Sequence, residues 1–439
     1  MRRVLIVALA LVLAACATTG PGTPLARHLI LVSVDALRPP FYLDPQFEAP
    51  TLKALVREGS HARAMEGIFP TVTYPSHTTI VTGVRPATHG IPFNLLFDST
   101  RERTRWYEEV ADLRTTTLWM WARAAGLTTA SVTWPVTLGA PMDWLLAERD
   151  YYARPNPIPD LVAASTPGLF ESLGLTPDAA MFKAVERWDA FTTSVAAGII
   201  RRHRPNLLLL HLVETDAVQH RVGPDDERVK PAVARVDGHL DTLRRAVADA
   251  GIAERTTFIV TGDHGFQGVR EYVYPNNVLT RAGLRACPRG TGWRATTHAA
   301  GGAGAVFVDP PNDRDLIART EAALRAVAGD RYTVLTRTQL DALGAMPGAA
   351  LGLEASPGWA IGTSCDRGLT EASRVGVGTH GFLPTRPTMA TGFVAAGAGV
   401  RTGVALERAR LVDVAPTAAR LLGIPAPAVE GRILHEILR

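Results

Sequence analysis

Lysine is scarce in this chain of 439 residues, and arginine supplies most of its positive charge. Lys53, Lys183 and Lys230 are the only lysines, although the formal net charge is +4. The sequence has no run of basic residues and no alternation of basic and aromatic side chains, which are the usual marks of a nucleic-acid surface. We therefore predict that the chain carries no nucleic-acid-binding module.

Long hydrophobic runs are missing once the first residues have passed. Arg2 and Arg3 precede an apolar stretch, Val4–Val12, that is too short to cross a bilayer as a helix. Two basic residues followed by a short apolar stretch are typical of an export signal. No later stretch reaches the roughly 20 apolar residues that a membrane span needs. We therefore expect an exported chain with no spanning helix in the mature protein.

Cysteine is rare, with only three residues in the chain. The segment Leu13–Cys16 (Leu-Ala-Ala-Cys) is similar to a bacterial lipobox, in which the cysteine becomes the lipidated first residue. We predict a signal peptide over residues 1–15, a lipid anchor at Cys16 and a tether over residues 16–27, which places the protein in the bacterial cell envelope, facing the periplasm or exterior. An ordinary signal peptide with a chance cysteine is the alternative. Cys287 and Cys365 remain, either as a disulfide or as two buried thiols.

Short apolar runs indicate the fold. The runs His28–Val34, Asn206–Val213 and Thr257–Thr261 have the character of parallel strands that are covered on both faces. Strand-like runs alternate with helical patterns such as Ala49–Glu58, as they do in βαβ units. The sequence predicts an α/β domain over residues 28–439 with a mainly parallel central sheet, helices on both faces and an inserted subdomain at about residues 266–375.

Acidic residues and histidines follow those three strands. They are Asp35, Asp216 with His220, and Asp263 with His264. The carboxyl ends of parallel strands form the ligand crevice of open α/β sheets, so these side chains should converge. Asp216 and His220 are four residues apart and would share one face of a helix. Any one of these groups could be a solvated acid or a hydrogen-bonded histidine, but their joint position at strand ends predicts a metal site.

Oxygen and imidazole ligands suit zinc, although manganese and iron stay open. Thr73 lies in the segment Phe69–Asn94, which is rich in threonine and histidine. Pro75 fits the first turn of a helix, so Thr73 would stand just before the helix N-terminus, where an anionic phosphoryl group is favoured. A threonine hydroxyl is a weak nucleophile and needs activation by a metal. A plain helix cap is the alternative role.

In these segments the chain resembles the nucleotide pyrophosphatase/phosphodiesterases, the type I phosphodiesterase branch of the alkaline phosphatase superfamily. The resemblance extends from His28 to the C-terminus. The motifs that carry it are Val34–Arg38, Phe69–Asn94, Glu214–Asp216 with His220 and Gly223-Pro224, Thr261–Gly265, and Gly378–Gly381. It implies an alkaline phosphatase-like fold and zinc-dependent hydrolysis of phosphodiester or pyrophosphate bonds, first of all those of nucleotides, through a phosphothreonine.

The resemblance also implies roles for individual residues. Thr73 would be the nucleophile, and Asn94 with the backbone N–H of Tyr74 would hold a phosphoryl oxygen. Two zinc ions are implied, one held by Asp35, Thr73, Asp263 and His264, and the other by Asp216, His220 and His380. The departures from the family pattern, Ser76 and Phe382, supply no metal ligand.

Related enzymes offer alternative functions. The formylglycine pattern of sulfatases is absent. Some phosphomonoesterases of the superfamily use a Lys-x-Arg pair, and the comparable stretch Ser131–Leu138 has neither residue, which favours a diester substrate. A phosphomonoesterase is the second expectation, a catalytically silent metal-binding envelope lipoprotein is the third, and lipid head-group diesters stay open as substrates.

Aromatic residues near the site offer a surface for a nucleobase. Tyr74, Trp134, Tyr151 and Tyr152 could stack on a base, or could simply pack a lid. We assign structural roles to His77 and His89, and we expect His211, within a predicted strand, to be a hydrogen-bonded core histidine rather than a ligand.

Overall fold

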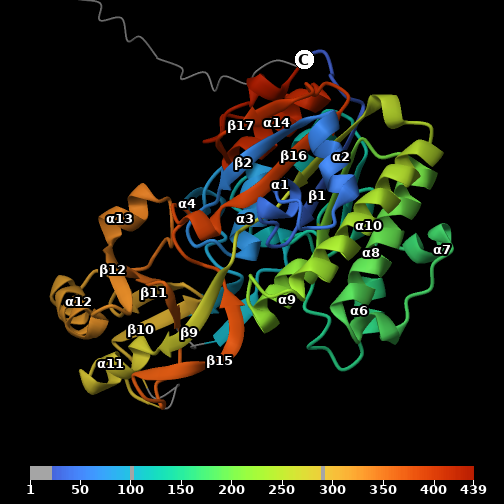
Figure 1. Cartoon of the computed structure of the whole chain (residues 1–439). Coiled ribbons are helices and arrows are strands. Elements are labelled where there is room, and N and C mark those ends of the chain that lie inside the picture. The colour runs from blue at the N-terminus through green and yellow to red at the C-terminus, as the bar shows by residue number, and fades with distance from the viewer. Residues whose placement is uncertain (1–21, 99–102, 288–291) are drawn as a thin grey trace, which may run out of the picture.

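The computed structural model describes residues 22–98, 103–287 and 292–439 (Figure 1). The predicted signal peptide and Cys16 lie outside these residues, and only residues 22–27 of the predicted tether fall within them. Among the helices that are described, none is both long enough and apolar enough to cross a bilayer.

The centre of the molecule is a nine-stranded sheet in the order β17-β2-β16-β8-β1-β7-β5-β6, with β18 paired to β2. The three predicted strands are its central members: β1 (His28–Val34), β7 (Leu207–Leu212) and β8 (Thr256–Thr261). β1 runs parallel to both neighbours, and only β16 (Thr391–Gly397) is antiparallel to the strands beside it. The prediction of a mainly parallel α/β sheet is confirmed. The remaining strands are β2 (Ser60–Glu66), β5 (Thr129–Val132), β6 (Trp144–Leu146), β17 (Val404–Leu406) and β18 (Ala409–Arg410).

Helices cover both faces of this sheet because alternate residues of its buried strands point to opposite sides. Ile30 and Val32 pack into one core with three helices, α2 (Pro50–Glu58), α8 (Val185–His203) and α10 (Val229–Asp249), which stand together beside the sheet in Figure 1. Leu29 and Leu31 pack into a second core with α3 (Thr73–Thr82), α5 (Leu118–Ala124) and α14 (Val414–Leu422). A sheet buried on both faces explains why β1 and β7 are apolar almost throughout.

The described residues between 267 and 379 form a separate lobe, drawn in yellow and orange in Figure 1, close to the position that the sequence predicts for an insertion. One of its sheets contains β9 (Gln267–Val273), β14 (Gly358–Ile361) and β15 (Thr370–Thr379), and the other contains β10 (Ala295–Ala300), β11 (Ala303–Val308), β12 (Tyr332–Thr336) and β13 (Leu351–Ala355). Its helices are α11 (Pro275–Arg281), α12 (Arg314–Ala328) and α13 (Arg337–Ala342). A disulfide joins Cys287 to Cys365, which decides between the two states left open above.

The remaining elements are shorter. They are α1 (Pro40–Leu43), α4 (Pro86–His89), β3 (Leu95–Asp98), β4 (Arg103–Trp106), α6 (Pro157–Ala163), α7 (Leu169–Leu173) and α9 (Glu214–Val222). Single 3-10 turns lie at Val110–Asp112, Ala179–Phe182, Ala253–Arg255, Pro387–Met389, Leu411–Asp413 and His435–Ile437.

Candidate active site

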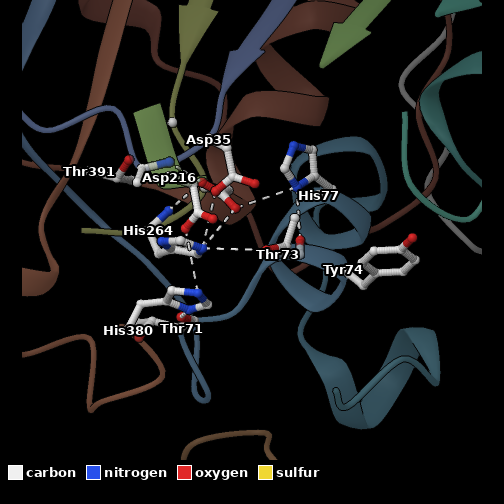
Figure 2. A network of polar contacts seen from close by, with 12 residues as sticks. Asp35, Thr71, Thr73, Tyr74, His77, Asp216, His264, His380 and Thr391 are labelled. Atoms are coloured by element: carbon white, nitrogen blue, oxygen red, sulfur yellow. Dashed lines mark hydrogen bonds and ion pairs between the residues drawn. The ribbon is translucent and has the colours of Figure 1, made fainter. Parts of the chain in front are cut away.

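The predicted ligands converge at the carboxyl edge of the central strands. Asp35 follows β1, Asp216 and His220 lie in α9 just after β7, and the pair Asp263-His264 follows β8. His380 arrives from the far end of β15, and Thr73 begins α3. Figure 2 shows Asp35, Asp216, His264, His380 and Thr73 directed toward a common point.

One set of ligand atoms surrounds the imidazole of His264. Its Nε2 atom lies 3.3 Å from Oδ1 of Asp35, 3.2 Å from Oδ2 of Asp263 and 3.5 Å from Oγ1 of Thr73. A second set is formed by Asp216, His220 and His380. Oδ1 of Asp216 is 3.4 Å from Nε2 of His220 and 3.6 Å from Nε2 of His380, and the two Nε2 atoms are 3.2 Å apart.

These spacings can be tested against the geometry of a bound ion. Metal–ligand bonds of about 2.0–2.1 Å in a tetrahedral arrangement require ligand atoms about 3.3 Å apart. The three separations from His264 Nε2 and the three within the second set lie between 3.2 and 3.6 Å. Asp216 also lies close to Asp35 and His264, so the two sets adjoin. These donor atoms form candidate metal-binding groups, and their spacing suits a tetrahedral ion such as zinc.

Backbone carbonyls orient the three imidazoles. The Nδ1–H groups of His220, His264 and His380 donate to the carbonyl oxygens of Gly378, Gly265 and Thr71, at 3.0, 3.1 and 3.0 Å. Burial lowers the pKa of all three histidines, that of His380 to about 3 with help from the neighbouring His220. The rings are therefore neutral, and each presents a free Nε2 lone pair, which is the state that a metal ligand needs.

The three carboxylates each keep one buried oxygen without a hydrogen-bond partner. These atoms are Oδ1 of Asp35, Oδ1 of Asp216 and Oδ2 of Asp263. Burial raises the pKa of all three, that of Asp35 to about 7 with a contribution from the charge of Asp216. Unpaired buried carboxylate oxygens are costly, and a bound cation removes that cost.

Local backbone structure fixes the directions of these acids. Oδ1 of Asp263 accepts the N–H groups of Ala36 and His264, at 3.0 and 2.9 Å. Oδ2 is the oxygen that lies near His264 Nε2. Ala36 has a left-handed φ of 59°, a strained value for a residue with a side chain, and its bond to Asp263 helps to hold it. Gly262 and Gly265 are required by close packing, because an added Cβ would lie 2.2 Å from Thr391 Oγ1 and 2.1 Å from Thr388 O respectively.

A buried acid fixes the start of α9, the helix that carries two ligands. The carboxylate of Asp189, in α8, accepts the N–H groups of Val213 and Glu214 at 2.9–3.1 Å. Glu214 is itself buried and pairs with Arg235. Satisfying the first N–H groups of a helix typically contributes about 1 kcal/mol, and here it also holds Asp216 and His220 in place.

Thr73 is the first residue of α3 rather than the residue before it. Its neighbour Tyr74 donates its N–H to Oδ1 of Asn94 at 2.9 Å. The N–H that the family resemblance assigns to a phosphoryl oxygen thus donates to Asn94 in this structure, and its role toward a substrate stays a prediction. Of the two predicted donors, the Tyr74 N–H and the Asn94 side chain, the Nδ2 group of Asn94 takes no part in this bond.

The aromatic predictions need larger corrections. Trp134 is fully buried and packs edge-on against His77, and Tyr151 is enclosed by Phe182 and Trp188. Neither ring offers a face to a ligand, so the assignment of both as base-stacking residues is contradicted. Burial in the core stabilises a large aromatic ring. The sequence alone did not show which of the aromatic residues would be buried.

The other two predicted aromatics have different surroundings. Tyr152 is 52% exposed and contacts Phe182, and no contact joins it to the ligands. Tyr74 is directed away from the metal ligands (Figure 2), and its ring lies 5.2 Å from that of Trp106. Trp106 was missed because nothing in its sequence neighbourhood marks it. It is the half-buried ring that stands beside the residue following Thr73.

Three further residues, His77, His211 and Glu148, contact Thr73, Asp35 or each other behind the metal ligands. His77 forms a bond of 2.8 Å through Nδ1 to the carbonyl oxygen of Thr73. His211 is 1% exposed and lies between two carboxylates, with Nε2 3.1 Å from Asp35 and Nδ1 2.8 Å from Glu148. Burial lowers the pKa of His211, but the charges of Glu148 and Asp35 outweigh it, and the net direction is upward. The expectation of a hydrogen-bonded core histidine agrees with these contacts, whereas Glu148 was not foreseen.

Comparisons with known proteins agree with this geometry. Over 267 residues the chain is 27% identical to ectonucleotide pyrophosphatase/phosphodiesterase family member 7 of Rattus norvegicus, which covers 59% of this chain and 55% of that protein. The chain thus spans about half the length of this curated relative. Two solved structures share the fold: human ectonucleotide pyrophosphatase/phosphodiesterase 5 (TM-score 0.71, 20% identity) and an inactive form of the murine enzyme in complex with AMP (TM-score 0.70, 19% identity). Each covers 94% of this chain and is covered completely.

A family model matches most of the chain. The model described as type I phosphodiesterase / nucleotide pyrophosphatase matches residues 29–383, a range that holds every predicted metal ligand. The resemblance noted in the sequence is confirmed, and with it the alkaline phosphatase-like fold. The chain belongs to the type I phosphodiesterase / nucleotide pyrophosphatase family.

Proposed function

We propose that this protein is a two-zinc phosphodiesterase that cleaves phosphodiester or pyrophosphate bonds, with nucleotides as its substrate class. The observation that carries the proposal is the position of Thr73: its hydroxyl lies 3.5 Å from His264 Nε2, within the first ligand set. Membership of the family supports hydrolysis of this bond type. The AMP complex of the murine relative supports a nucleotide substrate.

The residues divide the work of an in-line displacement. When bound, the two ions supply positive charge that favours the threonine alkoxide and the developing charge on the phosphoryl oxygens. Thr73 Oγ1 loses its proton to solvent and bonds to phosphorus, while the bond to the leaving oxygen breaks and that oxygen takes up a proton. Asn94 donates through Nδ2 to a non-bridging oxygen. Water then attacks phosphorus, the bond to Thr73 breaks and the hydroxyl is regenerated.

Charge around the site favours a diester over a monoester. Within the described residues, the hydrogen bonds and ion pairs of the metal ligands and Thr73 involve no lysine or arginine. Glu148 instead adds a negative charge near Tyr74. A monoester dianion would need compensation beyond the ions, whereas a diester carries one charge less on phosphorus.

The first test compares two aryl substrates. The purified protein with zinc should hydrolyse bis-p-nitrophenyl phosphate with a kcat/KM at least about tenfold above that for p-nitrophenyl phosphate, which corresponds to about 1.4 kcal/mol of transition-state stabilisation. A preference for the monoester would place the protein with the phosphomonoesterases. Absence of turnover on both, with zinc bound, would favour a silent metal-binding lipoprotein.

The cellular location forms a separate part of the proposal and rests on the sequence alone. We infer export and a lipid anchor at Cys16, supported by the apolar stretch Val4–Val12 and the Leu-Ala-Ala-Cys segment. Expressed in a bacterium, the protein should sediment with membranes, and a Cys16→Ser variant should be released in soluble form. A variant that stayed in the membrane fraction would contradict the anchor.

A further inference from the structure

A chain of hydrogen bonds leads away from Asp35 of the first ligand set through His211 and Glu148. Nε2 of His211 lies 3.1 Å from Oδ2 of Asp35, and Nδ1 of the same ring lies 2.8 Å from Oε2 of Glu148. Oε1 of Glu148 in turn accepts the hydroxyl of Tyr74, at 3.4 Å. The chain therefore connects a metal ligand to the residue that follows the nucleophile.

Both nitrogens of His211 face carboxylate oxygens. At 2.8 and 3.1 Å both contacts are within hydrogen-bonding distance. Hydrogen bonds to a carboxyl group are directional, and burial strengthens them. His211 is 1% exposed and the side chain of Glu148 is 17% exposed, so little water competes for these contacts.

The backbone gives His211 little freedom. It lies in β7 directly opposite Ser33 of β1, two residues before Asp35, and its carbonyl oxygen accepts the hydroxyl of Thr133 at 3.0 Å. Its ring packs 4.2 Å from that of His77, which bonds to the backbone of Thr73. A ring fixed in this way can set the rotation of the Asp35 carboxylate.

The contact has a consequence for the metal. Because Oδ2 of Asp35 is held by His211, Oδ1 is the oxygen left without a hydrogen-bond partner, and it is the one 3.3 Å from His264 Nε2. We propose that His211 and Glu148 are positioning residues that hold Asp35 with one oxygen directed at the ion of the first ligand set. This inference rests on the proposed two-zinc function.

The test measures zinc binding by the purified full-length protein in competition with a chromophoric chelator. Loss of an outer partner of a metal ligand typically weakens metal affinity by about 10- to 100-fold. His211→Leu should weaken one of the two zinc affinities by this factor and leave the other within about twofold, because Asp216, His220 and His380 do not contact His211. Glu148→Gln, at a partly exposed position, should weaken the same site in the same direction but less.

The two changes together provide a sharper criterion. If Glu148 acts on the ion through His211, the double variant should bind zinc no more weakly than His211→Leu alone, since effects transmitted through one partner do not add. High zinc concentrations should also restore the diesterase activity of both single variants.

A buried histidine of the same sheet serves as the control. His28 begins β1, is 8% exposed and bonds to the carbonyl oxygen of Pro205 at 2.9 Å. It lies about 23 Å along the strand from Asp35, at about 3.3 Å per residue. His28→Leu should leave both zinc affinities unchanged. Two unchanged affinities in His211→Leu and Glu148→Gln, or an equal loss at both sites, would overturn the positioning role alone. A wild-type protein that bound no zinc would overturn the proposed function together with this inference.

Discussion

Replacing Thr73 by alanine is expected to lower kcat on bis-p-nitrophenyl phosphate by about 10⁴-fold or more, a loss of the size seen when an enzyme nucleophile is removed. The hydroxyl of Thr73 lies 3.5 Å from His264 Nε2, and alanine deletes it with little change in volume. The six carboxylate and imidazole ligands stay, so we expect the variant to retain most of its zinc. Steady-state kinetics and metal analysis of the same preparation would measure both.

Thr82→Ala is the matched control for this experiment. Thr82 lies in the same helix, is 1% exposed and donates its hydroxyl to the carbonyl oxygen of Thr78 at 2.7 Å. Loss of the Thr82 hydroxyl should change activity by less than about threefold, because it removes one hydrogen bond within the helix and no contact with the metal ligands. Acid quenching of the wild-type reaction should trap a p-nitrophenyl-phosphoryl group on Thr73. Full activity of Thr73→Ala, or this group trapped on another residue, would rule out the proposed nucleophile.

Much of the site was predictable because it depends on local sequence. Asp35, Asp216 and Asp263 each follow a buried strand, and the ends of parallel strands meet at one edge whatever the rest of the chain does. The four-residue spacing of Asp216 and His220 likewise needs only that the chain turns helically, as it does in α9. These features are independent of the details of packing.

The parts that sequence could not show depend on register and on distant contacts. His211 meets Asp35 because β1 and β7 pair in one particular register, and Glu148 meets His211 across 63 positions of the chain. Trp134 is fully buried, whereas Trp106 is half-buried beside Tyr74, and this difference depends on tertiary packing. Composition and periodicity contain neither kind of information.

Removal of the metal ions is expected to abolish diesterase activity and to lower the melting temperature, with both restored by zinc. Three carboxylates lie close together at the site, and each has a buried oxygen that lacks a hydrogen-bond partner. An ion bound only to the folded chain stabilises it by about 4 kcal/mol when its free concentration is 1,000 times its Kd. Activity and thermal unfolding would be followed before chelation, after chelation and after zinc return, with magnesium return as the control for non-specific ionic effects.

The pH dependence of that stabilisation follows from the acids themselves. Burial, with the charge of Asp216, raises the pKa of Asp35 to about 7 in the folded metal-free protein, whereas an aspartate in the unfolded chain titrates near 4. The folded chain thus holds its proton more tightly, and the stability of the metal-free protein falls as pH rises from about 4 through about 7. Zinc competes with the same protons and binds best above this window. The melting-temperature difference between zinc-loaded and metal-free protein should therefore widen from pH 5 to pH 8. A difference that stayed constant or narrowed would mean that these carboxylates do not hold the ion.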